Sequence, residues 1–90
     1  MYGWDEKKRK FNLAKHGIDF RDAEKIFDGP LVTVEDTRDD YGEPRYVALG
    51  LLEEIVVSMV YTERGNTVRI ISIRKALRHE TRFFISQIGK

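Results

Sequence analysis

Apolar residues in the first thirty positions recur at helical spacing in two separate stretches. The first stretch follows Asp5, which can cap a helix, and stops at Gly17, a residue type that tolerates the left-handed conformation found after helix ends. We therefore predict a helix over Glu6–His16. The second stretch follows Asp19 and stops before Gly29, which predicts a short second helix. We expect the aromatic side chains of this region to be buried: Trp4, Phe11, Phe20 and Phe27.

From residue 31 the apolar positions alternate with a period of two, which is typical of strands. The predicted strands are Leu31–Asp36, Arg45–Leu52, Ile55–Thr62 and Thr67–Arg74. The breaks between them are short enough for hairpins, so an antiparallel meander is the simplest topology. From Lys75 onward, apolar residues mark one side of a closing helix: Ala76, Leu77, Phe83, Phe84 and Ile88. The predicted fold class is α+β, with two N-terminal helices, a four-stranded antiparallel meander sheet and a C-terminal helix.

Length and composition favour one small domain, which we place at residues 1–90. Ninety residues can form one hydrophobic core, and 41% hydrophobic with 34% charged residues is typical of a folded protein. The absence of cysteine excludes disulfides and thiolate metal sites and leaves His16 and His79 as the usual nitrogen ligands. We expect neither a metal nor a cofactor. The chain has no apolar segment long enough to span a membrane, so we expect a cytoplasmic protein.

Charge is distributed in blocks that the net charge of +1 conceals. Residues 1–18 carry five Lys or Arg against two Asp or Glu, residues 19–54 carry four against eleven, and residues 55–90 carry seven against two. The blocks therefore carry +3, −7 and +5. Such blocks can be opposed halves of one solvated surface. They can also indicate a basic cleft, built from both ends of the chain, that binds a polyanion.

The candidates for such a cleft are Lys8, Lys15, Arg45, Arg64, Arg69, Arg74, Arg78 and Arg82. On a solvated surface these residues would only increase solubility. Arginines at strand ends, beside the aromatic ring of Tyr61 on an incompletely covered sheet, would instead form a phosphate-binding trough. We favour the trough. Arg38 and Glu43, in the acidic turn before the second strand, are expected to lie in a loop and to pair with each other.

Lys15 and His16 lie at the end of the first predicted helix. Their simplest role is a favourable interaction with the helix dipole. If this helix packs on the sheet, neighbouring guanidinium groups would favour the neutral form of the lysine and make it a usable base. Glu80 falls beside the apolar stripe of the last helix, and we favour an ion pair with Arg74 or Arg69 over an acid–base role.

The sequence contains no Gly-rich phosphate loop, no carboxylate cluster for magnesium and no Ser/His/Asp arrangement. RNA cleavage is one reaction that a cationic trough can catalyse without a metal. The 2′-hydroxyl attacks its own phosphate while a base removes its proton, and arginines stabilise the charge that gathers on the phosphorane oxygens. The predicted catalytic residues are Lys15 or His16 as the base, with Arg64, Arg69, Arg74 and Glu80. The predicted RNA-binding residues are Lys8, Arg45, Tyr61 and Arg78.

Two other functions use the same residues. A non-catalytic module could bind RNA or a protein through the trough without cutting it. A purely structural interaction domain would have no affinity for RNA even at low salt.

A series of short motifs spans nearly the whole chain: Trp4-Asp5 with Lys8 and Asn12, Lys15-His16-Gly17 with Phe20, Arg38 with Gly42-Glu43 and Arg45, Gly50, Tyr61-Thr62 with Arg64, and Arg69-Ile70-Ile71-Ser72 with Arg74, Ala76 and Glu80. In this order and spacing, the chain resembles the BrnT family, the toxins of BrnT/BrnA type II toxin-antitoxin systems.

The resemblance implies a RelE-like ribonuclease fold and a cytoplasmic toxin that cuts RNA and halts translation. It implies as partner a small ribbon-helix-helix antitoxin of the BrnA kind. Operator DNA would be bound only through that antitoxin.

Overall fold

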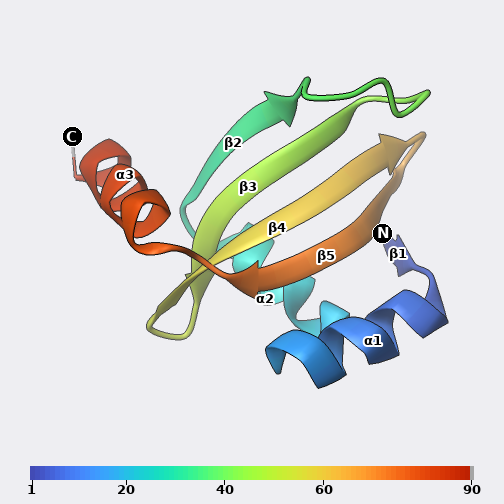
Figure 1. The fold of residues 1–90 in the computed structure, drawn as a ribbon, viewed down its shortest axis with the longest axis horizontal. Helices are drawn as coiled ribbons and strands as arrows, with labels where there is room; N and C mark the ends of the chain where they lie inside the picture. The colour runs from blue at the N-terminus through green and yellow to red at the C-terminus, as the bar shows by residue number, and fades with distance from the viewer. Residues whose placement is uncertain (90) are drawn as a thin grey trace.

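One five-stranded sheet organises the chain, with the strand order β1-β5-β4-β3-β2 (Figure 1). The computed structural model describes residues 1–89. The strands are β1 (Tyr2–Trp4), β2 (Leu31–Asp36), β3 (Arg45–Leu52), β4 (Ile55–Arg64) and β5 (Thr67–Lys75). The helical elements are α1 (Glu6–His16), the 3₁₀ helix η1 (Phe20–Asp22), α2 (Ala23–Asp28) and α3 (Arg78–Ile88).

The α+β class is confirmed, but the predicted four-stranded sheet is wrong because a fifth strand precedes the first helix. β1 pairs in parallel with β5, and Trp4 lies opposite Ile70. A strand of three residues is too short for an alternating pattern, and its partner lies far along the chain. The other four strands form the predicted antiparallel meander. The predicted second helix is divided into η1 and α2, and the Asp19 carboxylate caps η1 by accepting a hydrogen bond from Arg21 N.

The hydrophobic core lies on one face of the sheet, which we call the core face. Its buried residues come from η1, α2 and alternate positions of the strands: Phe20, Ala23, Ile26, Ala48, Val57, Met59, Tyr61, Ile70 and Ile73. At the contact between α2 and β3, a Cβ atom on Gly50 would lie 2.8 Å from Cγ2 of Ile26, so only glycine allows this close approach. Tyr61 is 6% exposed, and its ring stacks on Tyr46 and meets the edge of Phe27.

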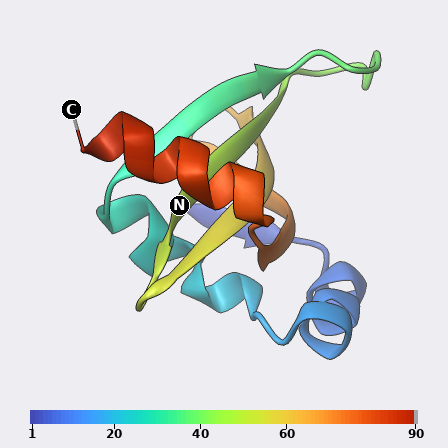
Figure 2. The same cartoon turned by 60° about the vertical axis from the view of Figure 1, so that its left-hand side comes forward.

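The opposite face, which we call the open face, is only partly covered. α3 contacts β2 and β3 (Figure 2), and among the residues of this helix only Phe84 is buried. Leu77, Phe83 and Ile88 are exposed although the apolar pattern placed them on the buried side, because the helix packs on the sheet mainly at β2 and β3. The side chains on the rest of the open face alternate with those of the core: Arg45, Thr62, Arg69, Ser72 and Arg74.

A polar clamp attaches α1 to the sheet. β1 covers the outer edge of β5 only as far as Ile70, and α1 lies beside the remainder of that edge (Figure 1). There the buried side chain of Asn12, 6% exposed, donates from Nδ2 to the backbone oxygens of Ile73 at 2.8 Å and Ile18 at 2.9 Å. Its Oδ1 accepts from Ile73 N at 3.1 Å. Asn12 therefore satisfies both backbone groups of an edge residue, as a further strand would do.

The predicted burial of Phe11 is wrong. α1 meets the rest of the protein through Arg9 and Asn12, the only residues of the helix that are buried. The guanidinium of Arg9 pairs with the carboxylates of Glu6 and Asp19. Because these polar residues form the contact, the Phe11 side chain stays outside the hydrophobic core and is 58% exposed.

We predict that Asn12→Ala lowers the free energy of unfolding by about 3 kcal/mol, since the backbone N–H and C=O groups of Ile73 lose their hydrogen-bond partner in a buried position. Urea unfolding monitored by circular dichroism would measure this loss. Lys10→Ala, on the exposed side of the same helix, is the control and should change stability by less than about 0.5 kcal/mol. Equal stability of the two variants would contradict the structural role assigned to Asn12.

Candidate functional site

Four polar residues form a row across the open face, one from each strand of the meander. Asp36 of β2 lies opposite Arg45 of β3, and Thr62 of β4 lies opposite Arg69 of β5. The register of β3 and β4 brings Arg45 beside Thr62. The row therefore places Arg45 on one side of Thr62 and Arg69 on the other, although the two arginines are far apart in the sequence.

The centre of this row contains polar atoms that the protein does not satisfy. Within residues 1–89, Oγ1 of Thr62 and Nε of Arg45 are buried and have no hydrogen-bond partner. Thr62 is 1% exposed. The Tyr41 ring covers the Arg45 guanidinium, whose central carbon lies 4.0 Å from the ring centroid. Buried groups without a partner are uncommon and carry a free-energy cost, so they point to a place where a polar ligand would be stabilising.

Arg74 lies further along β5 on the same face and is held by Glu80. Its two terminal nitrogens donate to the two carboxylate oxygens of Glu80 at 2.8 and 2.9 Å. Glu80 also accepts from Leu77 N at 2.7 Å, so it caps the start of α3. Mainly because of the Arg74 hydrogen bonds, the pKa of Glu80 is lowered to about 2. The predicted ion pair between Glu80 and Arg74 is confirmed.

The loop between β2 and β3 folds back on the arginines, and its predicted internal pair between Arg38 and Glu43 is wrong. Arg38 instead donates to both carboxylate oxygens of Asp36, at 2.8 Å each, and holds the pKa of Asp36 well below its usual range. Glu43 accepts from Arg64 at 2.8 and 3.0 Å. This pairing lowers the pKa of Glu43, with smaller contributions from Arg45 and Arg69. Arg64 therefore binds this carboxylate of the loop directly, and the charges of Arg45 and Arg69 also favour its ionised form.

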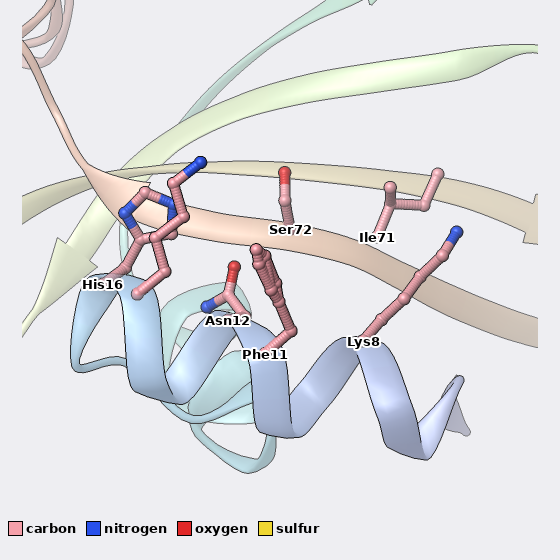
Figure 3. Close-up of a pocket in the computed structure, with 7 residues that line it drawn as sticks. Lys8, Phe11, Asn12, His16, Ile71 and Ser72 are labelled. Atoms are coloured by element: carbon pink, nitrogen blue, oxygen red, sulfur yellow. The ribbon is translucent and has the colours of Figure 1, made fainter.

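A pocket of about 200 Å³ lies between α1 and the edge of β5 (Figure 3). It is lined by Lys8, Phe11, Asn12, Lys15, His16, Ile71 and Ser72. Ser72 lies between Arg69 and Arg74 on β5, and the register places all three side chains on the open face. The charge of Arg69 also contributes to lowering the pKa of Asp5, the N-cap of α1, after the backbone hydrogen bonds from Lys8 and Lys7. The pocket therefore adjoins the strand that carries Arg69 and Arg74.

The predicted site residues fall into three groups in the structure. Lys8, Lys15 and His16 line the pocket, Arg45, Arg69 and Arg74 with Glu80 lie on the open face, and Arg64 lies at the end of β4 against Glu43. Arg78 is exposed in the first turn of α3. Tyr61 is separated from all of them, because its side chain is buried on the core face. Its ring has no free side on which a base could stack, so the predicted contact with RNA does not fit the structure.

Three residues of the site were missed from the sequence: Tyr41, Thr62 and Asp36. Tyr41 stands in an acidic turn whose composition indicates only a loop. Thr62 and Asp36 become part of the site through strand register, which is not visible in the pattern of either strand alone. Among residues 1–89, no group of three or more His, Cys, Asp or Glu side chains is placed to hold a metal ion.

The fold and the site define a small α+β protein with a cationic sheet face suited to a polyanion. A family model described as "ribonuclease toxin, BrnT, of type II toxin-antitoxin system" matches residues 4–80. The chain therefore belongs to the BrnT family of ribonuclease toxins, and the family implies a protein antitoxin as partner. A search among curated proteins gave no match. In the described part of the chain, none of the helices has the length and apolar character needed to cross a membrane.

We predict that Glu80→Gln is less stable than the wild type by about 1 kcal/mol at neutral pH, the upper range for a partly exposed ion pair. The pKa of Glu80 is about 2 in the folded protein and about 4.3 in an unfolded chain, so the stabilisation is complete above pH 5. It is lost as the pH falls from about 4.3 towards 2. Urea unfolding of both proteins between pH 7 and 2.5 would show the difference shrinking over this interval. Glu24→Gln on α2 is the control, and a difference that stays constant with pH would contradict the assignment.

Proposed function

We propose that this protein is a metal-independent endoribonuclease toxin that inhibits translation by cleaving RNA and that is neutralised by a ribbon-helix-helix antitoxin. The observation that carries the proposal is the row on the open face, where Arg45 and Arg69 flank the buried, unpaired hydroxyl of Thr62. Membership in the BrnT family supports the same function.

In the proposed reaction, the 2′-hydroxyl of one nucleotide attacks its own phosphate. A base takes the hydroxyl proton as the bond from the 2′-oxygen to phosphorus forms. The bond from phosphorus to the 5′-oxygen of the next nucleotide breaks, and this oxygen takes up a proton from water as it leaves. Lys15 and His16 are the two candidates for the base, because both line the pocket beside Ser72. The products would be a 2′,3′-cyclic phosphate and a free 5′-hydroxyl.

The arginines would stabilise the negative charge that develops on the phosphorane oxygens. Arg69 and Arg45 lie nearest the centre of the row. Arg74 would act in an orientation fixed by Glu80, whose two oxygens hold its terminal nitrogens. Arg64 would reach RNA only by exchanging Glu43 for phosphate, since its guanidinium is already paired. Lys8 and Arg78 would contact the RNA backbone on either side.

We predict that Arg69→Ala lowers the rate of RNA cleavage by about 10²- to 10³-fold and allows expressing cells to grow. Arg69 is the best test because removing Arg74 would also leave Glu80 without its partner. Arg21→Ala, an exposed arginine of η1 beside the core face, is the matched control and should keep full activity. Growth arrest by a folded Arg69→Ala protein would remove this residue from the catalytic group.

The same assay separates cleavage from binding. Purified protein incubated with labelled RNA in EDTA should yield shortened RNA if the reaction needs no metal. RNA that is shifted in a gel but remains intact would favour a module that binds without cutting. No affinity at low salt would leave only a structural interaction domain.

The proposed antitoxin can be tested separately. We expect a gene for a short ribbon-helix-helix protein immediately downstream, whose product restores growth and blocks RNA cleavage when mixed with the toxin. The basic residues of the open face suit an acidic segment of such a partner. An inhibitor of another fold at this position in the operon would contradict the ribbon-helix-helix assignment and leave the nuclease proposal intact.

A further inference from the structure

The pocket between α1 and β5 contains an aromatic ring that no role in the proposed reaction explains. Phe11 is 58% exposed, yet its neighbours on α1 are strongly polar and the helix gains no core contact from it. Figure 3 shows its ring rising from α1 towards β5, between Lys8 on one side and His16 on the other. An exposed aromatic ring in this position contributes little to folding and is available to a ligand.

The surroundings of the ring are cationic. Lys15 Nζ lies 5.7 Å from the centroid of the Phe11 ring, and Lys8 and His16 complete the basic rim of the pocket. An apolar ring within such a rim is poorly suited to an apolar protein segment, which would leave the charges without partners. It is well suited to a single-stranded nucleic acid, in which flat bases alternate with phosphates.

The strand on the other side of the pocket supports this choice of ligand. The pairing of β4 and β5 shifts between Val60 and Tyr61, and the shift leaves Ile71 as an extra residue of β5. Ile71 lines the pocket together with Ser72, whose neighbours on the open face are Arg69 and Arg74. A strand of RNA in contact with these arginines would therefore pass the mouth of the pocket.

We propose that this pocket is a nucleobase subsite, in which an unpaired base of the RNA stacks on Phe11 while Lys8 holds an adjoining phosphate. The subsite rests on the proposed function, since the RNA that it binds is the substrate of the open face. It supplies the stacking contact that the sequence assigned to Tyr61 and that the burial of Tyr61 excludes. Any base can stack on a phenyl ring, so the subsite would position the strand and not select a sequence.

The test compares two strands of equal length and charge that cannot be cut. One is a 2′-O-methyl RNA octamer, and the other is an abasic octamer with the same backbone. We expect Phe11→Ala to weaken binding of the base-containing octamer about tenfold or more and to leave binding of the abasic octamer unchanged. Phe11→Tyr should restore binding. Leu13→Ala, an exposed apolar residue of the same helix outside the pocket, is the control and should change neither affinity.

The outcomes separate this inference from the proposed function. If Arg69→Ala weakens binding of both octamers while Phe11→Ala weakens neither, the open face binds RNA and the subsite is wrong. Equal weakening of both octamers by Phe11→Ala would also overturn the subsite, because the effect would not depend on a base. If the wild type binds neither octamer at low salt, both proposals fall. Thermal unfolding of each variant would confirm that it is folded, as the exposure of Phe11 leads us to expect.

Discussion

The arrangement of the basic residues depends on one interaction, the clamp between the Asn12 side chain and the backbone of Ile73. The long helix α1 makes few apolar contacts, so the hydrophobic effect alone would leave its position beside β5 poorly determined. Hydrogen bonds are directional, and two of them to one residue fix both the height and the rotation of the helix along the strand. Lys8 and His16 lie one turn to either side of Asn12. The clamp therefore determines which strand residues they face.

Two arginines of the site are held by carboxylates of the protein itself. Arg74 is paired with Glu80, Arg64 with Glu43, and the loop that provides Glu43 also covers Arg45 with Tyr41. Such pairs keep like charges from repelling one another on a small surface and fix the guanidinium groups in one orientation. A phosphate must compete with the carboxylates, and partly exposed pairs of this kind are weak enough to exchange. Arg69 has no carboxylate partner among the ion pairs of residues 1–89, so a phosphate that binds it need not displace one.

Periodicity predicted most of the fold because β2 to β5 alternate clearly and follow one another as a meander. It would also have placed Tyr61 correctly, since this residue lies two and four positions after the core residues Met59 and Val57. β1, the Asn12 clamp and the pair of Glu43 with Arg64 could not be predicted, because each joins segments far apart in the chain. For Phe11, periodicity led to a wrong prediction. Its spacing is that of an apolar helix face, but polar residues provide the contact with the sheet, and the ring is left outside.

One face of the sheet provides most of the stability, and the other carries the residues of the proposed activity. The core face contains nine of the eleven buried apolar side chains of the described residues, so the open face can hold polar groups that a core would exclude. Leaving Oγ1 of Thr62 and Nε of Arg45 without partners costs about 1 to 3 kcal/mol for each group. Under the proposed function, a phosphate oxygen would accept hydrogen bonds from both groups and remove this cost once the Tyr41 ring, which covers the Arg45 guanidinium, is displaced by the RNA. Part of the affinity for RNA would then come from giving hydrogen-bond partners to these two atoms, which have none in the free protein. This contribution would favour RNA bound with a phosphate between Arg45 and Arg69.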